Sequence, residues 1–121
     1  MLKVLLCDDS LFMRTYEKKI LETGGCQVVG EAENGLEAVR QYKKYNPEIV
    51  IMDITMPKLD GIEATKKILQ QDAAAKVVMV SAMGQKAFMI DALKAGAVDF
   101  IVKPFNHEFF LTTIEKAAAR I

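Results

Sequence analysis

Cysteine, histidine, proline and tryptophan are scarce in this chain of 121 residues, with 2, 1, 3 and 0 copies respectively. The two cysteines, Cys7 and Cys26, lack the close spacing of a metal-binding motif. The strand pattern described below places Cys7 near the carboxyl end of one strand and Cys26 near the amino end of the next. In a parallel sheet these two ends are too far apart for a disulfide. We therefore expect both to be small buried hydrophobic residues.

An excess of charge of either sign is also lacking, since 16 basic residues stand against 16 acidic ones. This balance provides neither the basic face of a nucleic-acid-binding protein nor a polybasic segment for a membrane surface. No apolar run approaches the ~20 residues of a membrane-spanning helix, and the start, Met1-Leu2-Lys3-Val4, is not a signal peptide. We therefore expect one cytoplasmic domain over residues 1–121, with neither nucleic acid nor membrane as a partner.

What the chain does contain is a regular alternation of strand-like and helix-like patterns. Apolar strand-like segments cover residues 3–7, 27–32, 48–53, 76–82 and 97–103. A helical pattern follows each of them, and Ser10 and Asn106 are suitable caps for the first and the last helix. Five such units predict an α/β fold, a doubly wound parallel sheet flanked by five helices. Right-handed crossovers favour the flavodoxin-like strand order 2-1-3-4-5.

Helical spacing also predicts which side chains each helix turns toward the sheet. The expected inward sets, in chain order, are Met13, Tyr16 and Ile20; Leu36, Val39 and Tyr42; Ile62, Thr65 and Leu69; Ile90, Leu93 and Ala97; and Phe110, Ile114, Ala117 and Ile121. By the same spacing, Phe109 and at least one of Phe88 and Met89 are expected near solvent.

Polar side chains follow the strands, and Asp53 is central among them. Asp53 ends the run 49–52, whose unbroken apolar character is typical of a strand buried on both faces. Of the other strands, the first leads into Asp8 and Asp9, the fourth ends with Ser81 and the fifth with Lys103. The carboxyl ends of parallel strands share one edge of the sheet, where α/β proteins bind ligands. We therefore expect these five residues to form a site.

Three carboxylates at this edge favour a divalent cation. At ~4 Å and an effective dielectric constant of ~20, each pair of carboxylates repels by about 4 kcal/mol. Mg²⁺ removes this conflict, because it binds a few carboxylate oxygens and keeps positions open for water or a phosphate. We expect Asp9 and Asp53 to be direct ligands, with the backbone carbonyl of Thr55 in reach and Asp8 acting through a water.

The remaining groups of the site indicate phosphoryl transfer. Lys103 and Ser81 suit an anion that arrives between them, and positioning and charge neutralisation provide most of the catalysis in such reactions. A carboxylate is a competent nucleophile in covalent catalysis. We therefore expect Asp53 to attack phosphorus and become an aspartyl phosphate, with Ser81 and Lys103 contacting the phosphoryl oxygens.

These residues and their neighbours resemble the receiver domain of two-component response regulators, over the whole chain. The resemblance is carried by Asp8-Asp9, Met52-Asp53-Ile54-Thr55-Met56-Pro57, Asp60-Gly61, Val80-Ser81-Ala82 and Asp99-Phe100-Ile101-Val102-Lys103-Pro104-Phe105. Segment 81–85 is most similar to the single-domain chemotaxis members of the family. Phe100 stands where these often have tyrosine, so any signal carried by a phenol hydroxyl is absent.

The resemblance implies a monomeric signalling protein, not a conventional enzyme, which catalyses its own aspartyl phosphorylation and dephosphorylation. A histidine kinase would donate the phosphoryl group to Asp53, with Mg²⁺ held at Asp8, Asp9 and Asp53. The flagellar motor switch would receive the signal, and a phosphatase is a further expected partner. The Lys103–Pro104 peptide bond is expected to be cis.

The resemblance also places the output surface on the fourth helix, the fifth strand and the fifth helix. Apolar and basic side chains are expected to form a patch there, from Phe88, Met89, Phe100, Phe109, Lys86 and Lys116. A patch that is apolar in the middle and basic at its rim suits an amphipathic acidic peptide.

Other interpretations use the same residues. A phosphatase of the haloacid-dehalogenase class needs a second Asp two positions after its nucleophile, where this chain has Thr55. A flavin-binding electron carrier needs a loop that cradles phosphate, whereas Asp8-Asp9 would repel it. A stand-alone phosphorelay shuttle, and a receiver cut from a longer response regulator, remain alternatives to a chemotaxis protein.

Overall fold

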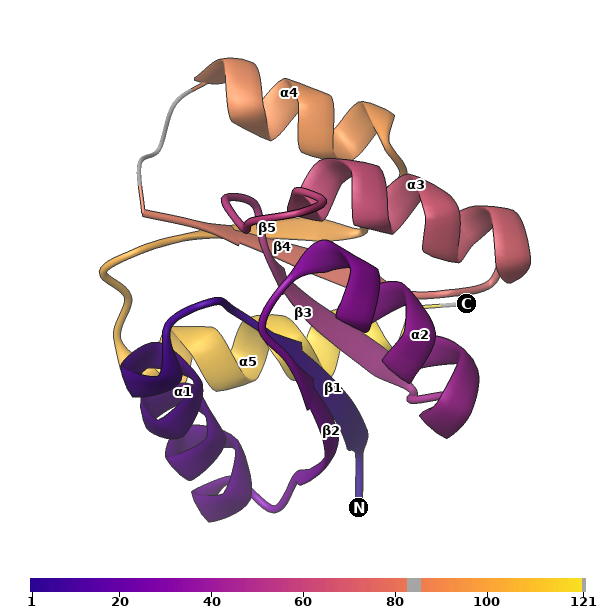
Figure 1. Ribbon diagram of the computed structural model, residues 1–121. Helices are drawn as coiled ribbons and strands as arrows, with labels where there is room; N and C mark the ends of the chain where they lie inside the picture. The colour runs from indigo at the N-terminus through magenta and orange to yellow at the C-terminus, as the bar shows by residue number, and fades with distance from the viewer. Residues whose placement is uncertain (83–85, 121) are drawn as a thin grey trace.

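The computed structural model describes residues 1–82 and 86–120, in which five strands alternate with five helices (Figure 1). The strands are β1 (Lys3–Cys7), β2 (Gln27–Ala32), β3 (Ile49–Asp53), β4 (Val77–Ser81) and β5 (Asp99–Val102). The helices are α1 (Leu11–Thr23), α2 (Gly35–Tyr45), α3 (Gly61–Gln71), α4 (Lys86–Lys94) and α5 (His107–Ala118). All strand pairs are parallel and the order is β2-β1-β3-β4-β5, which confirms the predicted fold.

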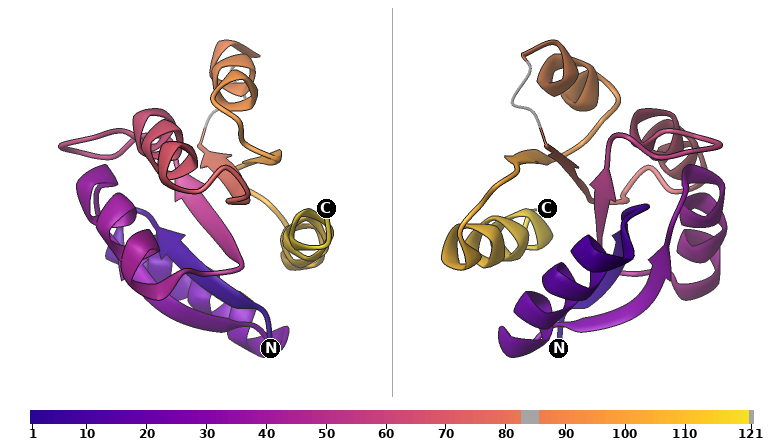
Figure 2. Two further views of the ribbon diagram at one scale, coloured as in Figure 1. Left: turned by 90° about the vertical axis from the view of Figure 1, so that its right-hand side faces the viewer. Right: turned by 60° about the vertical axis from the view of Figure 1, so that its left-hand side comes forward.

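Helices cover both faces of the sheet and bury two apolar layers (Figure 2). α1 and α5 pack on one face, where Leu21 and Phe110 are fully buried. α2, α3 and α4 pack on the other face, where Ala38, Ala64 and Ala92 are fully buried. The central strands β1 and β3 are thus covered on both sides, as their apolar sequences predict.

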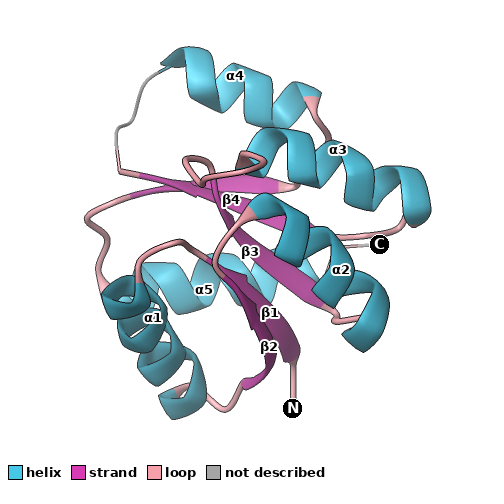
Figure 3. Cartoon of the chain, viewed as in Figure 1, coloured by secondary structure: helices cyan, strands magenta, loops and turns pink. Residues whose placement is uncertain are grey.

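Side-chain caps fix where four of the helices begin. The side chains of Ser10, Asn34, Asp60 and Asn106 each accept a hydrogen bond from the backbone N–H three residues further on. Each cap satisfies a donor that has no partner within its helix, and the caps at Ser10 and Asn106 were predicted. The caps lie in the loops that follow β1, β2, β3 and β5, so these loops gather at one end of the sheet (Figure 3).

The predicted inward faces of α2 and α4 are wrong in part. Leu36 is exposed, and Ile90 and Leu93 are 41% and 50% exposed, while Ala38 and Ala92 are fully buried instead. The prediction turned the largest apolar side chains inward. The helices instead turn alanines to the sheet, because a small side chain lets a helix backbone lie close to the strands.

Other predicted inward positions are confirmed. Tyr42, Thr65, Phe110, Ile114 and Ala117 are buried, and Val39, Ile62 and Leu69 are partly buried against the layer of α2 and α3. Ala97 is buried but follows the end of α4, and Ile121 lies outside the described residues.

Two local predictions are also confirmed. Cys7 and Cys26 are buried and free, and they belong to different apolar layers. The Lys103–Pro104 peptide bond is cis. None of the described helices is both long enough and apolar enough to cross a membrane.

Candidate functional site at the carboxyl ends of the strands

The structure brings three aspartates together at the carboxyl ends of β1 and β3. Asp8 and Asp9 directly follow β1, and Asp53 is the last residue of β3. One carboxylate oxygen from each of the three lies within 4.8 Å of the others. Asp8 and Asp53 are buried, whereas Asp9 is exposed. This group has the donor atoms and the opening to solvent that a hard divalent cation requires.

Lys103 follows β5 and turns its ammonium into this cluster. Its Nζ atom lies 2.9 Å from Asp8 Oδ2 and 3.7 Å from Asp53 Oδ1. Burial would lower the pKa of Lys103, but the hydrogen bond to Asp8 and the charges of Asp53 and Asp8 outweigh it and raise that pKa. The ammonium therefore keeps its charge inside the site.

Ser81 and Thr55 lie at the same edge. Ser81 is the last residue of β4 and is buried, and its carbonyl accepts the backbone N–H of Lys103 at 2.7 Å. Thr55 is exposed in the loop after β3, two residues beyond Asp53. All six residues predicted for the site therefore lie at the carboxyl ends of β1, β3, β4 and β5.

The loop after Asp53 is held in place by Gly61. The Gly61 N–H donates to the carbonyl of Ile54 at 2.7 Å. A Cβ atom at position 61 would lie only 2.0 Å from the Asp53 carbonyl oxygen. Only glycine fits this close approach without moving the loop, which gives Asp60-Gly61 a packing role beside the nucleophile candidate.

The charges of the site work against one another at Asp53. Burial raises the pKa of Asp53 to about 6. The Lys103 ammonium opposes this rise, and the carboxylates of Asp8 and Asp9 add to it. The carboxylate therefore prevails at neutral pH, in a setting that resists its negative charge. A bound cation would relieve this repulsion, so the residues fit Mg²⁺ chemically.

Sequence reasoning missed two buried charged residues of α1, Arg14 and Glu17. Arg14 donates to the Asp8 carbonyl at 2.6 Å and to Glu31 Oε1 at 3.1 Å, so it fixes the backbone beside the cluster. The predicted stripe of α1 is wrong at Tyr16, which is exposed. Positions 14 and 17 share the helical spacing of the buried Ile20, but charged residues are usually assigned to the surface.

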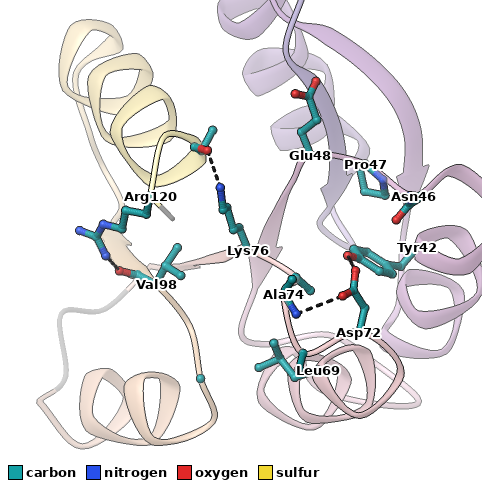
Figure 4. Close-up of a pocket in the computed structure, with 14 residues that line it drawn as sticks. Tyr42, Asn46, Pro47, Glu48, Leu69, Asp72, Ala74, Lys76, Val98 and Arg120 are labelled. Atoms are coloured by element: carbon teal, nitrogen blue, oxygen red, sulfur yellow. Dashed lines mark hydrogen bonds between the residues drawn. The ribbon is translucent and has the colours of Figure 1, made fainter.

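A hollow of about 660 Å³ lies at the amino ends of the strands, opposite the aspartates (Figure 4). Its polar groups bond to one another: the Tyr42 hydroxyl donates to Asp72 Oδ2 at 2.7 Å, and Lys76 Nζ donates to the carbonyl of Ala118 at 2.7 Å. In the described part of the chain, the three aspartates of the first site are the only group that could hold a metal ion. We therefore assign the chemistry to the carboxyl end.

Comparison with known proteins agrees with the geometry. A model of the response regulator receiver domain matches residues 4–115. Chemotaxis protein CheY of Listeria monocytogenes is 54% identical over 98% of this chain and 99% of its own length. Chemotaxis protein CheY of Bacillus subtilis is 54% identical over 94% of this chain and 95% of its own length.

The fold of this chain is also similar to that of a solved structure of a CheY protein. CheY in a CheX-CheY-BeF3-Mg complex from Borrelia burgdorferi has a TM-score of 0.93 and 37% identity to this chain. The match covers 98% of this chain and 90% of that one. The strand order, the aspartates and lysine at the strand ends and these comparisons together identify the family: the chain belongs to the response regulator receiver domains and is a CheY-like chemotaxis member.

Proposed function

We propose that Asp53 accepts a phosphoryl group from the phosphohistidine of a histidine kinase, in a reaction that requires Mg²⁺. The observation that carries this proposal is the meeting of three carboxylates within 4.8 Å with an ammonium 2.9 Å from one of them. A nucleophile, a cation site and a fixed positive charge are what in-line phosphoryl transfer needs. The matching domain extends over residues 4–115, and we propose that residues 1–121 act as one monomeric receiver domain.

The cation would be held by Asp9, Asp53 and the backbone carbonyl of Thr55. Asp8 accepts from the Ser10 N–H through Oδ1 and from Lys103 through Oδ2, both at 2.9 Å. Because both of its oxygens already have donors, Asp8 acts through a water. When bound, Mg²⁺ supplies positive charge to the phosphoryl oxygens. The related Borrelia burgdorferi CheY was solved in a complex that contains BeF3 and Mg, which supports Mg²⁺ as the cation.

The chain's own side chains then account for the transfer. The ionised Asp53 carboxylate forms a bond to phosphorus, and the bond from phosphorus to the donor nitrogen breaks. Lys103 passes from Asp8 and Asp53 to the phosphoryl oxygens, where its charge balances the group that has arrived. The Ser81 hydroxyl donates to a second phosphoryl oxygen. The same site, with water as the attacking group, returns Asp53 to its free state.

A surface for the kinase lies beside Lys103. An apolar hollow of about 520 Å³ is lined by residues that include Phe12, Tyr16 and Phe105. Phe12 is largely exposed, which a packed core does not explain. A kinase domain that covers this hollow would place its phosphohistidine within reach of Asp53.

The output surface lies on α4 and α5 and would receive the flagellar motor switch. Phe109 is 54% exposed on α5, as predicted, and Lys116 is exposed on the same helix. Phe88 is exposed too, but it lines a hollow between α3 and α4. Ile90 is ~200° from Phe88 around the helix, so Ile90 and Leu93 replace Phe88 in the proposed apolar patch. The Lys86 side chain and residues 83–85 lie outside the described part.

Intact mass spectrometry tests the chemistry. Incubation with acetyl phosphate and Mg²⁺ should add one phosphoryl group, and Asp53→Asn should abolish the addition. Asp60→Asn is the matched control, because Asp60 is exposed in the same loop and asparagine keeps its capping function. Labelling that survives in Asp53→Asn would move the acceptor to another residue.

Backbone NMR tests the output. The beryllofluoride-treated protein is titrated with an amphipathic acidic peptide from a motor-switch protein, and shifts are expected on α4 and α5. Shifts confined to α1 and α2 would contradict the proposed surface. Complete absence of binding would favour a phosphorelay shuttle, in which the phosphoryl group passes to a second histidine.

A further inference from the structure

Besides Gly61, a second glycine packs against the loop that carries the proposed cation ligand Thr55. This loop, residues 54–60, joins β3 to α3 and lies beside the start of α2 (Figure 3). Gly35 is buried and is the first residue of α2. A Cβ atom at position 35 would lie 2.1 Å from the carbonyl oxygen of Leu59 and 2.6 Å from its carbonyl carbon. The backbones of α2 and of the loop are therefore in direct contact at these two residues.

The start of α2 does not itself require a glycine. The Asn34 side chain caps the helix by accepting from the Glu37 N–H at 2.9 Å, and this cap makes no use of position 35. The φ of Gly35 is not positive, so its backbone conformation is open to other residues. Glycine is also among the poorest helix formers. The backbone of Leu59, and not the helix, is what excludes a side chain here.

The part of the loop that meets Gly35 is a tight turn of three residues. The Leu59 N–H donates to the carbonyl of Pro57 at 2.7 Å, and Lys58 between them has a φ of 68°. This φ and this hydrogen bond are typical of a classic γ-turn, which is rare and strained. A residue other than glycine seldom adopts a positive φ, and such a conformation persists only where the surrounding structure holds it. The contact with Gly35 is part of that surrounding structure.

The proposed ligand comes directly before this turn. Ile54 and Met56 are buried in the apolar layer under α2 and α3, and Leu59 is partly buried against the same layer. Thr55 lies between the two buried residues and is exposed. The carbonyl of Thr55 belongs to the peptide unit that leads into Met56, and the turn begins at the next residue, Pro57. A shift of the turn would therefore move this carbonyl.

We propose that Gly35 is a positioning residue for the cation site: its backbone contact with Leu59 holds the strained turn at Lys58, and the turn holds the Thr55 carbonyl at the site. The inference rests on the cation binding proposed above. Gly35 itself touches neither the cation nor the phosphoryl group. A methyl group at position 35 would push the Leu59 carbonyl away from α2, because backbone atoms cannot rotate aside as the end of a flexible side chain can.

Magnesium affinity and backbone NMR test the inference with Gly35→Ala. Calorimetric titration with Mg²⁺ at low temperature, where the protein is most readily kept folded, should give a Kd about 5-fold higher or more, as for a typical coupling between two sites. In the cation-free protein the amide signals of residues 55–59 should move. Gly24→Ala is the matched control at the far end of α1. Its Cβ atom would lie 2.7 Å from the side chain of Leu111, which can rotate aside.

The control should keep the wild-type Kd. A wild-type Kd in Gly35→Ala would overturn the inference, and so would an equal loss of affinity in Gly24→Ala, because the effect would then belong to stability alone. Absence of Mg²⁺ binding in the wild type would overturn the proposed cation site and the inference with it.

Hydrogen exchange in the wild type gives an independent test, which holds even if Gly35→Ala does not fold. Coupling is reciprocal, so a contact that favours cation binding must itself be favoured by the bound cation. Exchange of the Leu59 amide, which is bonded within the turn, should slow about 5-fold or more with saturating Mg²⁺. The Gly25 amide, bonded to the Glu22 carbonyl at 3.1 Å in a turn far from the aspartates, should be unaffected. Unchanged Leu59 exchange, while the signals of Asp9 respond to Mg²⁺, would overturn the inference alone.

Discussion

Lys103 Nζ lies 2.9 Å from Asp8 Oδ2 although 95 positions separate the two residues along the chain. β5 and β1 are not neighbours, because β4 and β3 lie between them in the sheet. The lysine side chain therefore reaches across the ends of both strands and passes Asp53 at 3.7 Å. One ammonium therefore serves two carboxylates and is free to change partner.

Replacing Lys103 by alanine should separate phosphorylation from output. Cation affinity should hold or rise, because the variant lacks a positive charge that competes for Asp8 and Asp53. Phosphorylation-dependent binding of the motor-switch peptide should fall at least tenfold. Calorimetry with Mg²⁺ and peptide titration measure the two effects, with Lys66→Ala on the exposed face of α3 as control. Normal peptide binding by phosphorylated Lys103→Ala would remove Lys103 from the output mechanism.

Mg²⁺ should stabilise the protein, and Asp9→Ala should abolish that gain. A ligand at a hundredfold excess over its Kd stabilises the folded state by about 2.7 kcal/mol through mass action. Without Mg²⁺ the variant should be more stable than the wild type, because one of three repelling carboxylates is gone. Chemical unfolding with and without Mg²⁺ measures both effects. The same gain in Asp9→Ala would exclude Asp9 as a ligand.

Glu17→Gln should flatten the dependence of stability on pH. The pKa of Glu17 rises from 4.5 to about 8 on folding, so between these values the folded state binds more protons than the unfolded state. The free energy of unfolding of the wild type must therefore fall as pH rises through this window. From pH 6 to 8 the loss due to Glu17 is about 2 kcal/mol.

The cation-free protein is the appropriate sample for this measurement. Urea unfolding at pH 6, 7, 8 and 9 should give parallel curves for the wild type and Glu22→Gln, and a shallower dependence for Glu17→Gln. The raised pKa of Asp53 changes the free energy of unfolding mainly below pH 6, so it does not obscure the comparison between these proteins. Identical slopes in all three proteins would mean that Glu17 is ionised throughout.

Arg14→Met should lower both the stability of the protein and its affinity for Mg²⁺, although it changes none of the side chains of the site. Methionine keeps the apolar length of the side chain but removes the donor to the Asp8 carbonyl and to Glu31 Oε1, so that Glu31 keeps, among the described residues, only its bond from Lys18 at 3.4 Å. We expect a loss of about 1–3 kcal/mol in the free energy of unfolding, and weaker Mg²⁺ binding because the backbone beside Asp8 is less fixed. Arg40→Met on the exposed face of α2 is the control. A loss of stability with unchanged Mg²⁺ affinity would confine Arg14 to a structural role.

The fold and the five polar groups at the carboxyl ends of the strands could be predicted from the sequence because their signals are local. A run such as 49–53 carries in five residues both the burial of a strand and the carboxylate that ends it. Capping at Ser10 likewise depends on one side chain and the N–H three residues on. Signals of this kind need no knowledge of the rest of the molecule.

The rotation of each helix could not be predicted in the same way. Ala92 faces inward while Ile90 and Leu93 are exposed, because the distance from α4 to the sheet decides which side chains fit, and that distance is a property of the assembled layers. Arg14 is buried because the Asp8 carbonyl and Glu31 accept its N–H groups, and Glu17 is buried on the same helix. A pattern that weighs each residue by its own hydropathy assigns both to solvent.

Both ends of the described chain lie away from the aspartates, and this has a practical use. Met1 and Leu2 precede the amino end of β1 (Figure 1). At the other end of the chain, the carbonyl of Ala118 accepts from Lys76, just before β4, and Arg120 donates to the carbonyl of Val98, just before β5. A fluorophore or a surface-attachment tag at either end would lie on the side of the amino ends of the strands, away from the aspartates. Kinase, cation and switch peptide could then be delivered to an immobilised protein without obstruction from the label.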